Sequence, residues 1–171
     1  RSIGEDLISQ ATALAMSSKF GVGNSSFRTE SGVTKYTDTV PFPAYTRKII
    51  EKVGLYDEEL VRNQDDEYNY RIREAGGRIL LAEDVKSEYF SRGSLRKLWK
   101  QYFQYGYWKV RVLQKHPRQM SPRQFVPLGF VLGLILTSLL SLFTPWGWQT
   151  LLALAVVYLA ANVTASMITA W

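Results

Sequence analysis

Three carboxylates stand in a row in the segment "VRNQDDEYNYRIREAGGRILL", residues 61–81: Asp65, Asp66 and Glu67. A carboxylate held beside an alcohol can accept its proton, so the run is a candidate general base. It also suits the beginning of a helix. Asn63 is a favoured N-cap, Asp66 falls on the third helical position and can reach back to that cap, and early acids complement the helix dipole. From residue types alone, capping is the simpler interpretation and proton transfer is the alternative.

The elements around this run predict a mixed α/β fold for residues 1–90. The first expected elements are a helix over 3–18, begun by a capping box of Ser2 and Glu5, and a Gly- and Ser-rich loop after it. A strand over 36–42, ended by Pro41 and Pro43, comes next, followed by a helix closed by Gly54. A helix over 64–75, stopped by Gly76 and Gly77, and strands over 78–85 and 86–90 complete the set. These strands are too few to close a complete sheet. Residues 1–90 are therefore interpreted as part of an α/β layer fold.

Charge divides the chain sharply. All fifteen Asp and Glu lie at or before Glu88, together with twelve Lys and Arg, whereas nine basic residues and no acid follow. The net charge of +6 therefore combines an acidic part with a strongly basic one. Cysteine is absent, which excludes a disulfide framework and a thiolate metal site.

Residues 94–115, "SLRKLWKQYFQYGYWKVRVLQK", predict a long amphipathic helix. Its apolar face holds Leu95, Leu98, Trp99, Tyr102, Phe103, Gly106, Val110 and Leu113, and its polar face Arg96, Lys97, Lys100, Gln104, Arg111 and Lys115. This profile is typical of a helix in a membrane interface, where aromatic rings lie at headgroup level. A buried helix or a nucleic-acid surface would show the same pattern. The apolar sequence that follows favours the membrane.

The last 48 residues, after Arg123, contain no Asp, Glu, Lys or Arg. Two apolar stretches, 125–143 and 150–171, flank the turn "TPWGW", and at about 1.5 Å per residue each can cross a bilayer core of about 30 Å. They predict a transmembrane hairpin, and the nine preceding cations place residues 1–123 in the cytoplasm. The expected parts are an α/β portion over 1–90, an interface helix and linker over 91–123, and two membrane helices over 124–171 of a multi-pass cytoplasmic-membrane protein.

These motifs together resemble those of one enzyme family. Inverting family-2 glycosyltransferases of the GT-A fold carry an acidic pair, then another acid and an Arg at the offsets of "QDDEYNYRIREAGGRI". The resemblance is closest to the membrane-bound exopolysaccharide branch, the succinoglycan or ExoA-like glucosyltransferases, whose members look like "FGVGNxxFR", "DTVPFGAYRR", "VGLYDEELVRNQDDEYNYRIREAGGRI" and "SLRKLWKQYFQYGYWKVRVLQKHP" in series. This chain departs from the second motif in "DTVPFPAYTRK", with Pro43 where Gly is usual and Thr46 where Arg is usual. It covers roughly residues 20–127 and implies that residues 1–90 are the acceptor side of a GT-A domain.

The resemblance assigns roles to the acidic run. Asp65 takes the position of the catalytic aspartate, and Gln64 stands where the first acid of the pair is usual. Asp66 is an additional acid that either supports Asp65 or caps the helix. Glu67 and Arg71 are expected to orient the site rather than react.

Further positions follow from the same resemblance. The expected interface-helix residues are Trp99, Gln101, Gln104, Tyr105 and Trp108. "QYFQY" stands where processive polysaccharide synthases show Gln-x-x-Arg-Trp, and its departure at Gln104 and Tyr105 implies an enzyme that adds a single sugar. Asp38 either contacts an acceptor or ends a strand, with the strand end favoured. His116 is expected at a helix end or a lipid headgroup.

Members of the family use a divalent metal, Mg2+ or Mn2+, to stabilise the departing diphosphate, and they hold it with an Asp-x-Asp motif. No Asp-x-Asp occurs in the 171 residues. We therefore expect the metal ligands and the nucleotide-binding half to precede Arg1, no metal site within this chain, and no activity of this portion alone.

The expected function is inverting transfer of one hexose, glucose from UDP-glucose, to a lipid-linked saccharide in exopolysaccharide biosynthesis. The alternative is a non-catalytic membrane protein whose cytoplasmic α/β module binds a partner or anionic lipids, with the acids acting as caps. Nucleic acid is not an expected partner, because the basic residues adjoin the apolar hairpin.

Overall fold

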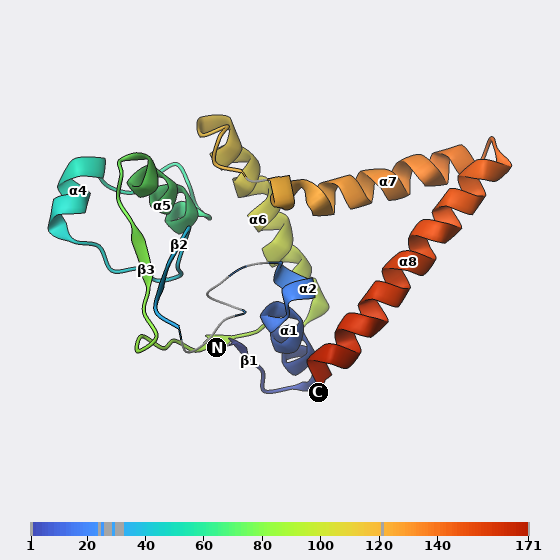
Figure 1. Cartoon of the computed structure of the whole chain (residues 1–171), viewed down its shortest axis with the longest axis horizontal. Helices are drawn as coiled ribbons and strands as arrows, with labels where there is room; N and C mark the ends of the chain where they lie inside the picture. The colour runs from blue at the N-terminus through green and yellow to red at the C-terminus, as the bar shows by residue number, and fades with distance from the viewer. Residues whose placement is uncertain (1, 24, 26–28, 30–32, 121, 171) are drawn as a thin grey trace. The chain divides into compact units, whose positions relative to one another are not determined.

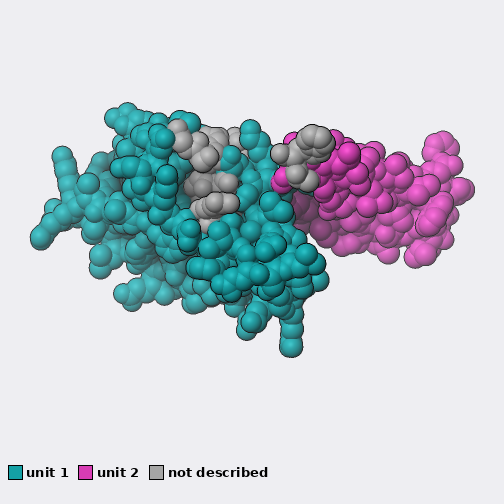
Figure 2. All heavy atoms as spheres, turned by 90° about the horizontal axis from the view of Figure 1, so that it is seen from below, with its two compact units in different colours: residues 1–119 teal, residues 120–171 magenta. Residues whose placement is uncertain are grey.

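The computed structural model describes residues 2–23, 25, 29, 33–120 and 122–170. The chain forms two compact units, Arg1–Gln119 and Met120–Trp171, coloured teal and magenta in Figure 2. Most of the predicted motif "FGVGNSSFR" past Gly23 lies outside the described residues. The expected boundary between residues 90 and 91 stays a prediction.

Unit 1 is a mixed α/β arrangement, as predicted (Figure 1). Its elements are β1 (Ser2–Ile3), α1 (Leu7–Ser17), α2 (Lys19–Val22), β2 (Lys35–Thr37), α4 (Arg47–Val53), α5 (Gln64–Glu74), β3 (Ile79–Leu81), β4 (Tyr89–Phe90) and α6 (Leu95–Lys115). Strand β1 pairs parallel with β4, and β2 pairs antiparallel with β3, with Tyr36 opposite Leu80. Two small sheets of two strands each result, so a GT-A domain remains a proposal.

A small apolar core fixes α5 in place. Tyr68 and Ile72 of α5 pack with Ile79 of β3, and partly buried Val40, Tyr45, Ile49 and Val53 complete the cluster. The helix ends as predicted, since Gly76 has a φ of 80°, which favours glycine. The acidic run therefore lies at the start of a helix whose buried face packs against the core and whose other end is fixed by the glycine stop.

The beginning of the chain differs from the prediction. Ser2 and Ile3 form β1, and α1 begins only after Asp6, which caps it in a reciprocal box with Ser9. The predicted box of Ser2 and Glu5 is therefore wrong, because strand pairing with β4 takes the residues before Gly4. The predicted loop over 17–32 also contains a short helix, α2, which Ser18 caps by accepting from the N–H of Gly21 at 3.0 Å.

Strand β2 is shorter than predicted and stops at Thr37 rather than near Pro41. The side-chain amide of Asn69, fully buried on α5, donates to Thr39 Oγ1 at 2.9 Å and to the Val40 carbonyl at 3.4 Å. These bonds draw residues 39–40 onto α5, and this explains why the chain leaves the sheet early.

Unit 2 is an antiparallel helix pair preceded by a 3-10 turn, Pro122–Phe125. Helix α7 (Val126–Ser141) packs against α8 (Pro145–Ala170), with the rings of Phe130 and Tyr158 4.8 Å apart. The segment "TPWGW" is not the turn that was predicted. Thr144 Oγ1 accepts from the N–H of Gly147 at 3.1 Å, so Pro145 and the two tryptophans form the first turn of α8.

Among the described residues one helix, α8, is long and apolar enough to cross a membrane, over Pro145–Thr169. Helix α7 is apolar but has 16 residues. At about 1.5 Å per residue it reaches about 24 Å, short of a core of about 30 Å. The predicted hairpin of helices is thus present, whereas two full spans are not shown.

Candidate active site

The first turn of α5 does not begin with the predicted side-chain cap. Asn63 occupies the N-cap position with a φ of 62°, a left-handed conformation that Asn tolerates better than most residues, and its side chain makes no capping bond. Its Nδ2 instead donates to the carbonyl of Tyr105 on α6 at 3.1 Å. The residue that was expected to start α5 therefore joins α5 to α6.

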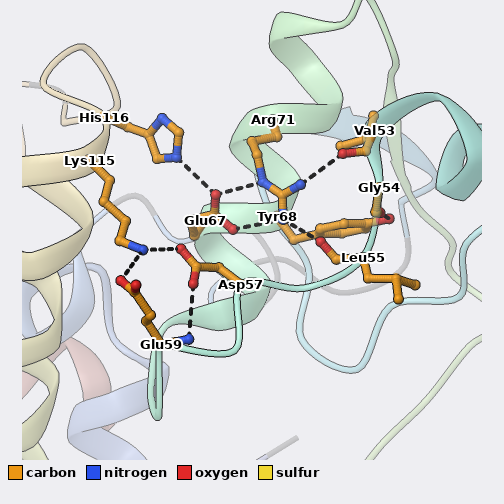
Figure 3. Close-up of polar contacts among 10 residues, drawn as sticks. All are labelled: Val53, Gly54, Leu55, Asp57, Glu59, Glu67, Tyr68, Arg71, Lys115 and His116. Atoms are coloured by element: carbon orange, nitrogen blue, oxygen red, sulfur yellow. Dashed lines mark hydrogen bonds and ion pairs between the residues drawn. The ribbon is translucent and has the colours of Figure 1, made fainter.

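Glu67 is the most deeply buried of the three acids, with 1 % of its side chain exposed. Its two oxygens accept from Arg71 Nε at 2.6 Å and Nη2 at 3.1 Å, and its Oε1 lies 2.9 Å from Nε2 of His116 (Figure 3). A buried carboxylate needs such partners to offset lost hydration. Glu67 is thus held by two cationic or polar partners and is not available to a substrate.

Arg71 extends this network toward the loop after α4. It donates to the carbonyls of Val53 at 2.9 Å and Leu55 at 2.8 Å, and its guanidinium lies 4.7 Å from the ring centre of Tyr68 (Figure 3). All of these contacts are structural. The expectation that Glu67 and Arg71 orient the site stays a prediction.

Asp66 points to the end of α6. Its Oδ2 accepts from Lys109 Nζ at 2.5 Å and from Gln119 Nε2 at 2.8 Å, and Lys109 also donates to Gln119 Oε1 at 2.7 Å. Asp66 does not reach back to cap α5. The explanation of the whole acidic run by capping is therefore wrong for Asp66 and Glu67, because both are engaged by side chains from outside α5.

Asp65 differs from its two neighbours. Its Oδ1 accepts the backbone N–H of Asp66 at 2.9 Å, which satisfies one first-turn amide, and no described Lys, Arg or His forms an ion pair with it. Burial raises the pKa of Asp65, and the negative charge of Asp66 raises it further, while Lys109 opposes the rise. Asp65 thus combines a raised pKa with a second oxygen, Oδ2, to which the described residues supply no ion-pair partner.

A tyrosine cluster adjoins Asp65. Burial, the hydroxyl of Tyr56 at 3.3 Å and then the charge of Asp65 raise the pKa of Tyr45. The Tyr45 hydroxyl donates to Asn69 Oδ1 at 3.1 Å, and its ring lies edge-on to Tyr68 at 4.8 Å. Neutral phenols and a partly buried carboxylate therefore share one side of α5.

Two other predicted site residues have local roles in the structure. Gln64 donates to the carbonyl of Val61 at 3.1 Å, one turn before it. Asp38 follows the last residue of β2 and is exposed, and its Oδ1 accepts from Thr37 Oγ1 at 3.2 Å. The position of Asp38 agrees with the favoured interpretation as a strand end, and a role toward an acceptor stays untested for both residues.

The predicted interface helix α6 has two contrasting faces. Gln101 is buried and donates to the hydroxyls of Tyr89 and Tyr105, both at 2.9 Å, while its carbonyl oxygen accepts from Arg92 at 3.2 Å. Gln104 and Trp108 are half-buried. Large apolar and aromatic side chains are exposed on another face: Leu95, Trp99, Tyr102, Phe103 and Val110. Within unit 1, α6 therefore combines a polar inner face with an uncovered apolar one.

Among the described residues, no group of three or more Asp, Glu or His side chains is arranged to hold a metal ion. The side chains of the described part therefore do not fit the divalent ion that the resemblance implies. Two surface hollows of the described part are lined by residues other than Asp65. One is lined by Thr34, Glu83, Asp84 and Lys86, and the other by Val53, Tyr70, Arg71, Glu74, Ala75 and His116, two of which contact Glu67. The candidate site therefore consists of the Asp65 carboxylate, whose pKa is raised, and the contacts of Asp66, Glu67 and Arg71 that hold the start of α5.

Sequence reasoning missed Lys109, Gln119 and Tyr45, and it gave His116 no partner. Lys109 shares the inner face of α6 with Gln101, Tyr105 and Val112, at helical spacings of four and three residues. That spacing was visible in the sequence. The contact with an acid 43 residues earlier was not.

Comparison with curated proteins finds two relatives. The chain is 33 % identical over 129 residues to the succinoglycan biosynthesis protein ExoA of Rhizobium meliloti strain 1021, covering 75 % of this chain and 39 % of that protein. It is 27 % identical over 142 residues, 81 % of this chain and 43 % of the relative, to the dolichyl N-acetyl-alpha-D-glucosaminyl phosphate 3-beta-D-2,3-diacetamido-2,3-dideoxy-beta-D-glucuronosyltransferase of Methanococcus voltae. The chain thus spans about two fifths of each relative's length. No family model and no solved structure matches it.

Proposed function

We propose that this chain is the acceptor-side and membrane-anchoring portion of an inverting family-2 glycosyltransferase of the GT-A fold, with Asp65 as its general base. The observation that carries the proposal is the contrast within the acidic run. Glu67 and Asp66 each have a cationic partner, whereas Asp65 has none among the residues that the structure describes and has a raised pKa. Similarity to a succinoglycan biosynthesis protein and to a glucuronosyltransferase supports the reaction class.

The reaction needs one proton acceptor from this chain. As the acceptor hydroxyl attacks the anomeric carbon, its proton passes to the Asp65 carboxylate, a new C–O bond forms, and the bond to the nucleoside diphosphate breaks with both electrons. One displacement inverts the anomeric configuration. General-base assistance of this kind is worth about 10²- to 10⁴-fold in rate. The divalent metal supplies charge stabilisation to the diphosphate when bound by residues outside this chain.

The substrates follow from the resemblance and the relatives. We propose a nucleotide sugar, UDP-glucose, as donor and a lipid-linked saccharide as acceptor, with one hexose added per acceptor in exopolysaccharide biosynthesis. A lipid-linked acceptor keeps its reactive sugar close to the membrane surface. The exposed apolar face of α6 and the apolar helices α7 and α8 support a cytoplasmic-membrane location, with unit 1 in the cytoplasm and α7 and α8 as a membrane hairpin.

The rival function is a membrane protein that binds a partner or anionic lipids without catalysis. Incubating membranes that contain the complete protein with labelled nucleotide sugars and extracted lipid-linked saccharides separates the two. Our proposal predicts a labelled lipid product whose new linkage has the anomeric configuration opposite to that of the donor. The absence of transfer from every donor, together with binding of anionic vesicles, would favour the rival.

A further inference from the structure

The acidic run is fastened to α6 at three points. Asn63 Nδ2 donates to the Tyr105 carbonyl at 3.1 Å, Asp66 Oδ2 accepts from Lys109 Nζ at 2.5 Å, and Glu67 Oε1 lies 2.9 Å from Nε2 of His116. Their partners follow one another in order, with Tyr105 and Lys109 on α6 and His116 directly after its last residue. The backbone of Asp65 is thereby fixed from both sides while its own side chain makes no contact of this kind.

The contact of Asp66 is a closed triangle rather than a single ion pair. Lys109 and Gln119 both donate to Asp66 Oδ2, and Lys109 donates to Gln119 Oε1, so each member contacts the other two. Lys109 and Asp66 are 19 % and 29 % exposed, so solvent screens the pair only in part. Lys109 has no other role visible in the described residues.

This triangle stands one residue from Asp65. The charges that act on the pKa of Asp65 come from Asp66 on its own helix and from Lys109 on α6, and the charge of Asp65 in turn raises the pKa of Tyr45. An ionised Asp66 alone would hinder ionisation of Asp65, as like charges do at short range. The cation on α6 offsets this hindrance without touching Asp65.

We propose that Lys109 is a positioning residue for the reaction, which balances the charge of Asp66 so that Asp65 is ionised and free to accept a proton at working pH. This inference rests on the proposed function of Asp65. It adds a residue from α6, 44 positions away in sequence, to the machinery of the acidic run. In this proposal Gln119 orients both Lys109 and Asp66 through its side-chain amide.

The test is the pH dependence of kcat/KM for sugar transfer by the complete protein in membranes. The acidic limb of this profile is the pH range in which kcat/KM falls as the general base becomes protonated. Lys109→Met is expected to move this limb to higher pH by about 0.5–1 pH unit, because a nearby cation is lost. Asp66→Asn is expected to move it downward, and the double variant to return it close to the wild-type position. Lys109→Arg should keep the wild-type limb.

The matched control is Lys115→Met. Lys115 also lies on α6 and also pairs with acids, Asp57 and Glu59 (Figure 3). The charges that act on the pKa of Asp65 come instead from Asp66 and Lys109. A purely structural Lys109 would behave like Lys115, with reduced stability or rate and an unmoved limb, and that result would overturn the proposal. If Asp65→Asn kept full transfer, the proposed function would fail instead, whatever the limb showed.

Discussion

Glu67 and His116 lie 49 residues apart in the sequence, yet Glu67 Oε1 is 2.9 Å from Nε2 of His116. The histidine stands directly after the last residue of α6, and its ring lies 5.3 Å from that of Tyr70. The predicted position of His116 at a helix end is confirmed. The contact makes Glu67 a structural acid that joins α5 to the residue after α6, which supports our proposal that Asp65, rather than Glu67, accepts the proton.

Glu67→Gln should destabilise the protein through loss of this shared charge. Removing one partner of a buried ion pair typically costs about 3–5 kcal/mol, and we expect about 2 kcal/mol because Arg71 and His116 are partly exposed. For a chain of this size that corresponds to a fall in Tm of about 4–8 °C. Thermal unfolding of the purified protein in detergent measures it.

Helix α4 offers the control. Arg47 and Glu51 form an ion pair at the same spacing of four residues, 3.0 Å long but largely exposed. Glu51→Gln should change the free energy of unfolding by no more than about 0.5 kcal/mol. Equal Tm values for the two variants would contradict the assigned burial of Glu67.

The pKa of Asp65 gives a prediction that does not depend on activity. Because burial raises this pKa in the folded state, ionised Asp65 costs stability, and the cost appears as pH rises from the unfolded value through the folded one. Asp65→Asn should therefore match wild type at about pH 3 and exceed its Tm at about pH 7. A Tm difference independent of pH would count against a raised pKa.

Asp57 should show the opposite sign. Its hydrogen bond with Lys115 lowers its pKa, so ionised Asp57 contributes stability that is present above the unfolded value and is lost as pH falls through the folded one. Asp57→Asn should lower Tm at about pH 7, and the deficit should shrink toward about pH 3. A deficit that grows toward acid pH would refute the contact between Asp57 and Lys115.

The uncovered face of α6 predicts a depth pattern in bilayers. Spin labels at Trp99, Phe103 and Val110 should lie about 5–10 Å below the headgroups, whereas labels at Lys97 and Arg111 should remain in water. Power-saturation measurements with oxygen and a water-soluble nickel complex report the depth of the first set of labels and the water exposure of the second. Uniform exposure to water along the helix would exclude an interfacial position.

The sequence predicted those elements whose signals are local. Helix α5 and its glycine stop, α4 with its closure at Gly54, and α6 all follow from periodicity and caps within their own residues. Helix α1 began later than predicted because Ile3 pairs with Phe90, a partner that no local pattern reveals. The start of α8 was placed too late because Pro145 at a first helical turn was interpreted as a turn residue.

The same distinction applies to the candidate site. Asp65, Glu67 and Arg71 were predicted from the resemblance of one local motif and its offsets, and the structure joins the last two as an i, i+4 pair. The partners that separate the roles of the three acids, Lys109 and His116, come from 43 and 49 residues away. Only the folded arrangement shows that, among the described residues, two of the acids have ion-pair partners and Asp65 has none.

The central claim is that Asp65 accepts the proton of the sugar acceptor. Its most direct test is the rate of sugar transfer by membranes that contain the complete protein with Asp65→Asn, compared with wild type and with Asp57→Asn at equal folded amounts. We predict a loss of at least about 10²-fold for Asp65→Asn and a rate near wild type for Asp57→Asn. Transfer by Asp65→Asn within a few-fold of wild type would contradict the claim.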